Sequence, residues 1–266
     1  MPRKPRFAPP NYALHITQRG NYRQPVFFTD EDRNRFLTLM DQHADDRRVL
    51  VHGYALMSNH FHLVVTGRED GAVSRLLQHV TGQYAQYLHG RLNRRGRLWQ
   101  SRFYSCVLDA HHFLSALAYV DLNPVRARMV DGAVDSAWTS AAAHCGLAAA
   151  IPEWLELEAL HSRVTTAGWR ERLGQPEPRG EVAALRRATR TEVRWESRAL
   201  SRNWRSSFRC GCDRCRRGLR PKSQRKRRSF LWRSRGKRGL EVNCRKVGGA
   251  QYLTSCRRPS RDRNLL

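Results

Sequence analysis

The chain has 266 residues, enough for one large or two small domains, and its 49 lysines and arginines exceed its 23 acidic residues to give a formal net charge of +26. This excess indicates a polyanionic partner, most simply nucleic acid. No run of about eighteen apolar residues and no apolar stretch behind the basic N-terminus is present, so we expect neither a membrane span nor a signal peptide. Two isolated cysteines in the first 180 residues, Cys106 and Cys145, suit a reducing cytoplasm.

The positive charge is unevenly distributed. Residues 1–180 carry 22 basic and 17 acidic residues, a net charge of +5, whereas residues 181–266 carry 27 and 6, a net charge of +21. The overall charge is therefore mostly a property of the C-terminal tail.

The apolar pattern predicts strands and helices in alternation up to residue 122. We expect strands over residues 12–19, 49–57, 60–66 and 103–108, and helices over residues 30–44, 72–89 and 110–122. Asp30 is the expected N-cap of the first helix. The order β-α-β-β-α-β predicts an α+β fold of the ferredoxin-like (RRM-like) type: an antiparallel sheet with two helices on one face. The other face would be free to hold single-stranded nucleic acid.

Three parts of the chain are expected. Residues 1–130 would form the domain with the sheet and the helix that follows it. Residues 131–190 would form a helical extension, and residues 191–266 a basic tail rich in Arg, Ser, Trp and Cys.

His60 and His62 share one face of a predicted strand, because side chains alternate along a strand, while Phe61 and Leu63 face a core. Two neighbouring imidazoles on one face can share a metal ion and leave positions for substrate oxygen and water. A structural role in the strand is the alternative that this spacing leaves open.

Tyr119 and Asn123 lie four residues apart, so on a helix they share a face and can approach the two histidines. A tyrosine hydroxyl can attack phosphorus when a metal polarises the phosphate, which gives a phosphotyrosine. Because Asn123 precedes Pro124, it is expected near the helix end. The alternative is a core tyrosine followed by a helix stop. Rival nucleophiles, which we rank lower, are Tyr84, Tyr87 and Tyr104.

Basic side chains beside an aromatic ring mark a candidate nucleic-acid surface, because they suit phosphate contact and base stacking. The alternative is a core tryptophan with solvated arginines. His15, His111 and His112 are expected to serve packing or capping. The candidate DNA-binding residues are Arg19, Asn21, Arg94, Arg95, Arg97, Trp99, Gln100 and Arg102.

Several stretches together resemble the REP-associated tyrosine transposases, relatives of the single-tyrosine HUH transposases, over about residues 10–145. They are Thr17-Gln18-Arg19-Gly20-Asn21, Val26-Phe27-Phe28, Ser58-Asn59-His60-Phe61-His62, Gly96-Arg97-Leu98-Trp99-Gln100-Ser101-Arg102-Phe103 and Tyr119-Val120-Asp121-Leu122-Asn123-Pro124-Val125-Arg126-Ala127. No single stretch is decisive, but the combination is specific.

This resemblance implies that His60 and His62 are the HUH ligands for Mg²⁺ or Mn²⁺, with Asn123 as the third protein ligand and Tyr119 as the nucleophile. It implies cleavage and transfer of single-stranded DNA at hairpin-forming repeats, with a 5′-phosphotyrosine and a free 3′-hydroxyl. An imidazole pair favours Mn²⁺ at least as much as Mg²⁺. The expected partner is single-stranded or hairpin DNA, bound by a monomer or a homodimer.

Two other functions stay open at this point. One is a catalytically impaired ferredoxin-like protein that binds hairpin DNA or RNA without cutting it. The other is an HUH enzyme of replication origins, although such enzymes usually differ in the order of the motifs and often carry paired tyrosines.

The tail departs from the family pattern at Thr191, where apolar periodicity ends while Trp and Cys, which are scarce in disordered tails, become frequent. Cys210, Cys212 and Cys215 suggest zinc ligands, with Cys244 or Cys256 as a fourth, but a paired C-x-x-C spacing is missing. Codon degeneracy allows residues 191–196 to be the shifted-frame translation of a segment that encodes Gly-Pro-Leu-Gly. We therefore hypothesise that the tail is a frameshift product, which translation of the other reading frames tests.

Overall fold

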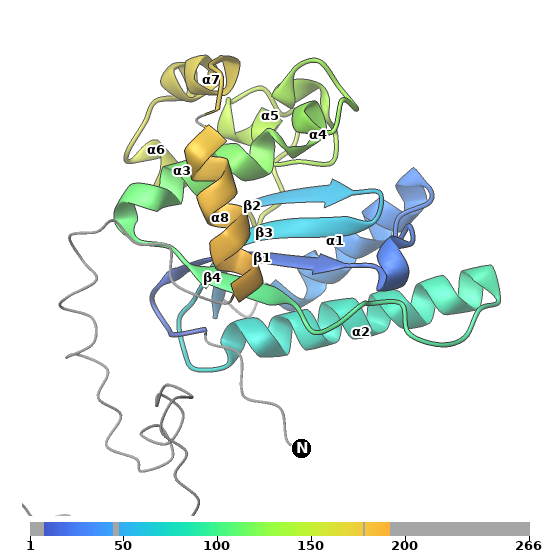
Figure 1. The fold of residues 1–266 in the computed structure, drawn as a ribbon. Coiled ribbons are helices and arrows are strands. Elements are labelled where there is room, and N and C mark those ends of the chain that lie inside the picture. Colours follow the sequence, from blue (N-terminus) through green and yellow to red (C-terminus); the bar gives the residue numbers. More distant parts are fainter. Residues whose placement is uncertain (1–7, 45–47, 178, 192–266) are drawn as a thin grey trace, which may run out of the picture. The chain divides into compact units, whose positions relative to one another are not determined.

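The computed structural model describes residues 8–44, 48–177 and 179–191 (Figure 1). The expectations for the tail, including the cysteine cluster and the frameshift, concern residues 192–266 and lie outside the described residues. The strands are β1 (Ala13–Arg19), β2 (Val49–Met57), β3 (His60–Gly67) and β4 (Tyr104–Val107). The helices are η1 (Asn21–Arg23), α1 (Asp30–Ala44), α2 (Ala72–Leu92), α3 (Ala110–Asp121), α4 (Asn123–Arg126), η2 (Ala133–Asp135), α5 (Ala141–His144), α6 (Glu158–His161), α7 (Thr166–Gly174) and α8 (Arg179–Thr191).

The four strands form one antiparallel sheet in the order β2-β3-β1-β4. The strand β3 lies between β2 and β1, so His62 pairs with Ala55 on one side and with Thr17 on the other. The prediction of a mixed fold with a four-stranded antiparallel sheet is confirmed; β2 has the predicted ends, and no end of the other strands differs from the predicted one by more than one residue. Alternation along β3 places Phe61 and Leu63 in a core with α1 and α2.

The expectation of a free second face of the sheet is wrong. Figure 1 shows α3 and α8 lying over this face. Val64, Leu117 and Leu185 pack there in a second core. The physical reason is that the strands present apolar side chains on this face too, and burying them stabilises the fold.

Helix α3 approaches β2 closely at Gly53, where a Cβ atom would lie 2.7 Å from a methyl group of Leu117. The last turn of α3 is fixed by the fully buried Asp121. The Asp121 carboxylate accepts hydrogen bonds from Ser140 Oγ at 2.8 Å, His144 Nδ1 at 2.7 Å and Trp169 Nε1 at 3.1 Å. These contacts tie α3 to the helices that follow it.

The His144 ring carries both protons, because its two nitrogens face the Asp121 carboxylate and the His52 carbonyl, which can only accept. Burial alone lowers the pKa of His144, but the charge of Asp121 and these hydrogen bonds outweigh it and raise the pKa. A buried ion pair thus joins α3 to α5.

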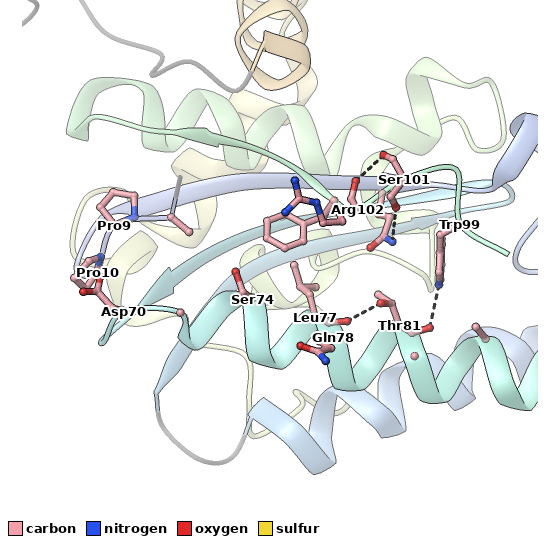
Figure 2. A pocket seen from close by; sticks show the side chains of 16 residues that line it. Pro9, Pro10, Asp70, Ser74, Leu77, Gln78, Thr81, Trp99, Ser101 and Arg102 are labelled. Atoms are coloured by element: carbon pink, nitrogen blue, oxygen red, sulfur yellow. Dashed lines mark hydrogen bonds between the residues drawn. The ribbon is translucent and has the colours of Figure 1, made fainter. Parts of the chain in front are cut away.

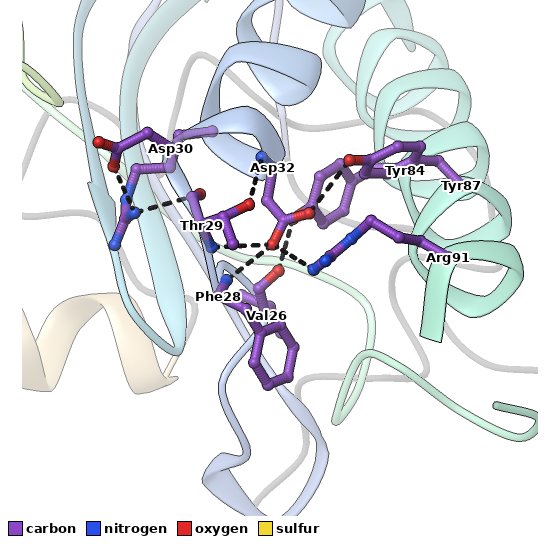
Figure 3. Close-up of polar contacts among 9 residues, drawn as sticks. Val26, Phe28, Thr29, Asp30, Asp32, Tyr84, Tyr87 and Arg91 are labelled. Atoms are coloured by element: carbon purple, nitrogen blue, oxygen red, sulfur yellow. Dashed lines mark hydrogen bonds and ion pairs between the residues drawn. The ribbon is translucent and has the colours of Figure 1, made fainter. Parts of the chain in front are cut away.

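The first helix is capped by Thr29, which corrects the expectation for Asp30. Thr29 Oγ1 accepts a hydrogen bond from the Asp32 N–H at 3.3 Å, and the Asp32 carboxylate accepts one from the Thr29 N–H at 3.1 Å (Figure 3). This reciprocal pair is a capping box, which competes better for the N-terminus than the exposed Asp30 does. Asp30 instead pairs with Arg33.

The fully buried Asp32 carboxylate also joins α1 to α2 and to the preceding loop. It accepts hydrogen bonds from the Phe28 N–H at 2.8 Å, from Tyr87 Oη at 3.2 Å and from Arg91 at 2.7 Å (Figure 3). Within that loop, the N–H groups of Val26 and Phe27 donate to the Ser58 carbonyl. The network therefore supports the turn from which β3 and its histidines begin.

We expect Asp32→Ala to lower the free energy of unfolding by about 2–4 kcal/mol, because two backbone N–H groups and a tyrosine hydroxyl lose their acceptor. Asp30→Ala is the matched control on the same helical turn, with an expected change within about 0.5 kcal/mol. Urea unfolding followed by circular dichroism measures both. Equal stability of the two variants would contradict the structural role of Asp32.

The regular elements found between residues 131 and 190, as far as the structure describes them, are helices. They pack directly on the domain that holds the sheet: Val51 bridges to Leu155, and Ala55 to Thr139. Among the described residues, no helix has the length and apolar character needed to cross a membrane.

Candidate functional site

A cavity of about 630 Å³ lies over the second face of the sheet, between β1, β3, β4 and the helices α3, α4 and α8. Its walls include the four residues predicted to form the reaction centre: His60, His62, Tyr119 and Asn123. The sheet thus supplies the two histidines, and the end of α3 with the start of α4 supplies the other two.

The two predicted metal ligands lie together in the wall of this cavity. The ring centroids of His60 and His62 are 5.0 Å apart, and the rings are nearly perpendicular. Burial, with the charge of Arg19, lowers the pKa of His60 to about 4. Burial and the nearby basic groups also hold the pKa of His62 well below its usual value. Both rings are therefore neutral near pH 7, which is the form that binds a metal.

In both rings Nδ1 makes a hydrogen bond, whereas Nε2 makes none with the residues that the structure describes. Asn59 Oδ1 lies 2.6 Å from His60 Nδ1 and can only accept, because the Asn59 amide nitrogen donates to the Arg23 carbonyl. The His60 Nδ1 atom therefore carries the proton, and Nε2 keeps its lone pair. In His62, Nδ1 is engaged by His15 Nε2 at 2.9 Å. Such second contacts orient histidine ligands in metal sites.

Tyr119 is buried in the last turn of α3, and its ring meets the His62 ring edge-on, with centroids 5.5 Å apart. The Arg126 guanidinium lies over the Tyr119 ring, 4.2 Å from its centroid. Arg186 Nε on α8 donates a hydrogen bond to the Tyr119 hydroxyl at 3.3 Å. The hydroxyl is thus next to a positive charge that suits a phosphate.

Asn123 begins the short helix α4, with Pro124 in its first turn, so α3 ends before the asparagine as expected. Asn123 Oδ1 accepts a hydrogen bond from Arg126 at 2.9 Å, whereas its buried Nδ2 atom has no partner. Arg126 also forms a two-pronged ion pair with Glu177, with contacts of 2.6 and 2.7 Å. The amide is therefore held by a clamp that reaches the segment after α7.

The donor set fits a divalent metal in part. Two neutral imidazoles with available Nε2 atoms face the cavity, whereas the buried Asn123 atom without a partner is Nδ2, a hydrogen-bond donor that cannot bind a metal. Within the described ranges, no group of three or more His, Cys, Asp or Glu side chains is arranged to hold a metal ion. A metal here would therefore need oxygen ligands from Asn123, the substrate or water.

Arginines line the cavity beyond the predicted centre. Arg19 contributes from β1, and its pKa is lowered by burial and by the neighbouring Arg23 and Arg190 guanidiniums. A concentration of positive charge this close to a partly buried wall favours an anionic ligand. The five arginines of the lining are Arg19, Arg23, Arg126, Arg186 and Arg190.

The other predicted DNA-binding residues do not all line this cavity. Gln100 lines the cavity with the histidines. Asn21 lies in η1, where its N–H donates to the Leu98 carbonyl. The three arginines of the loop after α2 are exposed; they are Arg94, Arg95 and Arg97. Their role in DNA binding stays a prediction.

Trp99 and Arg102 line a different hollow of about 870 Å³, between α2 and the segment that leads into β4 (Figure 2). The Trp99 indole donates a hydrogen bond from Nε1 to the Thr81 carbonyl at 3.0 Å and packs edge-on against Phe61. The ring is therefore held from two sides by the protein, which favours its packing role, and base stacking by Trp99 stays a prediction.

The rival tyrosines differ in position. Tyr84 is buried with its hydroxyl on the Val26 carbonyl, and burial raises its pKa, while Tyr87 binds Asp32. Both lie on α2, on the side of the sheet away from the histidines. Tyr104 on β4, in contrast, pairs with Thr17 and lines the same cavity as Tyr119. Tyr104 is the appropriate control in any test of the nucleophile.

Two kinds of residue were not predicted for the site. Arg126, Arg186 and Arg190 reach it from α4 and α8, and a periodic pattern does not reveal which helix will cover the sheet. His15, expected in packing, touches His62; its spacing of two from Thr17 and four from Arg19 on one strand face is the signal that identifies it. Burial lowers the pKa of His15 to about 3, so its ring is neutral.

The fold brings a histidine pair on the sheet, a tyrosine on a helix and several arginines together in one cavity. Residues 9–123 match the family described as "Transposase IS200 like". The matched segment extends from just before β1 to Asn123 and so contains all four residues of the predicted centre. No curated protein sequence matches the chain.

Solved structures that are similar to the chain include two described as transposases. A REP-associated tyrosine transposase bound to a REP hairpin shares 17% identity, with a TM-score of 0.45, over 53% of this chain and 82% of that one. A structure described as a transposase from Deinococcus radiodurans R1 shares 16% identity, with a TM-score of 0.33, over 45% of this chain and 96% of that one.

Proposed function

We propose that the protein is a metal-dependent single-stranded DNA endonuclease and strand transferase that acts at hairpin-forming repeats, as REP-associated tyrosine transposases do. The observation that carries the proposal is the convergence of His60, His62, Tyr119 and Asn123 on one cavity lined by arginines. The strand order β2-β3-β1-β4 supports a ferredoxin-like sheet as the platform. Such a protein would work in the cytoplasm, as a monomer or a homodimer.

In this proposal the Tyr119 hydroxyl oxygen attacks the phosphorus of one phosphodiester. A bond forms between that oxygen and phosphorus, and the bond from phosphorus to the 3′-oxygen breaks. The tyrosine proton leaves as the oxygen bonds, and the departing 3′-oxygen takes up a proton to become a free hydroxyl. The DNA on the other side stays linked as a 5′-phosphotyrosine, which a second 3′-hydroxyl can attack to rejoin the strand.

The remaining residues of the cavity bind and orient. Arg186 and Arg19 would neutralise the phosphates that flank the scissile one, since guanidiniums suit phosphate geometry. His60, His62 and Asn123 would hold Mg²⁺ or Mn²⁺. When bound, the metal would polarise the scissile phosphate and offset the charge that develops on it.

The test is a covalent adduct. The full chain is incubated with Mn²⁺ and a hairpin oligonucleotide carrying a single-stranded flank, labelled in parallel at the 5′ end or the 3′ end, and run on a denaturing gel. Retention of the 3′ label on the protein, with release of a 5′-labelled fragment, is the expected result. Oligonucleotide binding without any adduct would reject the cleavage activity.

The lowered pKa values of the histidines predict metal binding that depends little on pH near neutrality. A lowered pKa keeps the ring neutral above that pKa, so protons compete with the metal only near pH 4 for His60. We expect Mn²⁺ affinity to change less than about twofold between pH 8 and pH 6, whereas two imidazoles with ordinary pKa values near 6.5 would lose more than about tenfold. Electron paramagnetic resonance of free Mn²⁺ measures this, and a tenfold loss would contradict the burial of the pair.

A second candidate function is hairpin binding without cleavage. The observation that favours it is the engagement of Asn123 Oδ1 by Arg126, which removes that oxygen from the metal unless the amide or the guanidinium moves. Mn²⁺ titration separates the two: a chain that binds the hairpin but no Mn²⁺ is the impaired form.

A further inference from the structure

The cavity contains a chain of three hydrogen-bonded side chains that begins outside the matched family segment. Thr189 on α8 contacts His15 on β1, and His15 contacts His62 on β3. Thr189 and His15 are 3% and 2% exposed, so solvent does not compete for these bonds.

The direction of the chain follows from the hydroxyl of Thr189. Thr189 Oγ1 donates its one hydrogen to the Leu185 carbonyl at 2.8 Å, a bond to the residue four positions earlier on the helix. Only lone pairs of Oγ1 then face His15 Nδ1, which lies 2.8 Å away. His15 Nδ1 must therefore donate, and in a neutral ring the other nitrogen, Nε2, has no hydrogen.

The same constraint passes to the next ring. His15 Nε2 can only accept, so His62 Nδ1, 2.9 Å away, carries the hydrogen. The His62 Nε2 atom is left with a lone pair. If the Thr189 hydroxyl turned to donate to His15 instead, every bond would reverse and His62 Nε2 would carry a hydrogen, which a metal ligand cannot do.

We propose that Thr189 and His15 are positioning residues that set His62 in its metal-binding tautomer through this relay. The proposal extends the proposed function, and its statement about metal affinity rests on that function. It assigns to α8, which lies beyond residue 123, a direct part in metal affinity. The His15 and His62 rings are nearly parallel, at 12°, with centroids 5.1 Å apart, and the direct hydrogen bond between them restrains the orientation of the His62 ring.

The experiment uses the full chain with Mn²⁺ alone. Thr189→Val keeps the shape of the side chain but leaves His15 Nδ1 without an acceptor, and Thr189→Ser restores the hydroxyl. We expect Thr189→Val to bind Mn²⁺ at least about tenfold more weakly than the wild type, as for other residues that orient metal ligands, and Thr189→Ser to stay within about threefold. Thr38→Val is the matched control, since Thr38 makes the same hydroxyl bond, to the Asn34 carbonyl, on the exposed side of α1.

A second pair of variants covers a failure of Thr189→Val to fold, which circular dichroism detects. His15→Phe keeps an aromatic ring but removes the acceptor, and His15→Gln places an amide oxygen near the former Nε2 atom. We expect weakened Mn²⁺ binding for His15→Phe and recovery for His15→Gln. Folded Thr189→Val or His15→Phe with wild-type affinity would overturn the relay.

A spectroscopic readout separates the relay from the metal proposal. In metal-free protein, ¹⁵N chemical shifts of His62 report which nitrogen carries the hydrogen. We expect hydrogen on Nδ1 in the wild type and in Thr189→Ser, and on Nε2 in Thr189→Val. If the wild type binds no Mn²⁺, the proposed metal site is wrong, but the ¹⁵N shifts still test the relay. A His62 tautomer in Thr189→Val that is the same as in the wild type would reject the relay.

Discussion

Tyr119→Phe is expected to abolish the covalent adduct with hairpin DNA and to reduce strand cleavage at least about 10³-fold, since removing a nucleophile removes the reaction path itself. The change deletes one oxygen. The ring stays, with its edge contacts to His15 and His62 and its stacking under Arg126. Hairpin affinity should therefore stay within about threefold of the wild type.

Tyr104→Phe is the control for this variant, because Tyr104 lines the same cavity from β4. It should keep both the adduct and the cleavage rate within about threefold. An adduct that survives Tyr119→Phe and disappears in Tyr104→Phe would identify Tyr104 on β4 as the nucleophile and contradict the proposed geometry.

His62→Ala is expected to weaken Mn²⁺ binding at least about 100-fold and to eliminate cleavage, because it removes one of two nitrogen ligands. His60→Ala should have a similar effect, since His60 lies on the same face of β3. Hairpin binding should persist in both, because the arginines of the cavity are unchanged. Calorimetric titration with Mn²⁺ and a binding assay without metal measure the two properties separately.

His111→Ala supplies the control for a general effect of losing a histidine. His111 is exposed on α3, away from the cavity lining. Wild-type Mn²⁺ affinity in His111→Ala, together with its loss in His62→Ala, assigns the metal to the strand pair. Wild-type Mn²⁺ affinity in both His60→Ala and His62→Ala would show that this histidine pair does not bind the metal.

Local patterns predicted the elements well, because they depend on neighbouring residues. Alternation placed His60 and His62 on one face and Phe61 in the core, and helical spacing placed Tyr119 and Asn123 together. The first cap was wrong by one residue, since a choice between Thr29 and Asp30 depends on which side chain reaches the Asp32 N–H.

Contacts between distant residues were not predictable in this way. Thr189 and His15 are 174 positions apart in the sequence, and Arg126 and Glu177 are 51 positions apart. The apolar residues of α8, which are Leu185 with Val182, Ala184 and Ala188, do not show that this helix will cover a sheet that already has helices on its other face. These contacts depend on which surfaces the folded domain leaves to be buried, and they supply the relay and the clamp around Asn123.

The most direct test of the account is to locate the protein–DNA bond. The full chain is trapped with Mn²⁺ and a hairpin substrate, digested with nuclease and protease, and the peptide that carries the nucleotide remnant is sequenced by mass spectrometry. We expect one modified residue, Tyr119, linked through a 5′-phosphate. A remnant on Tyr104 or on any other residue, or cleavage that proceeds without a covalent intermediate, would contradict it.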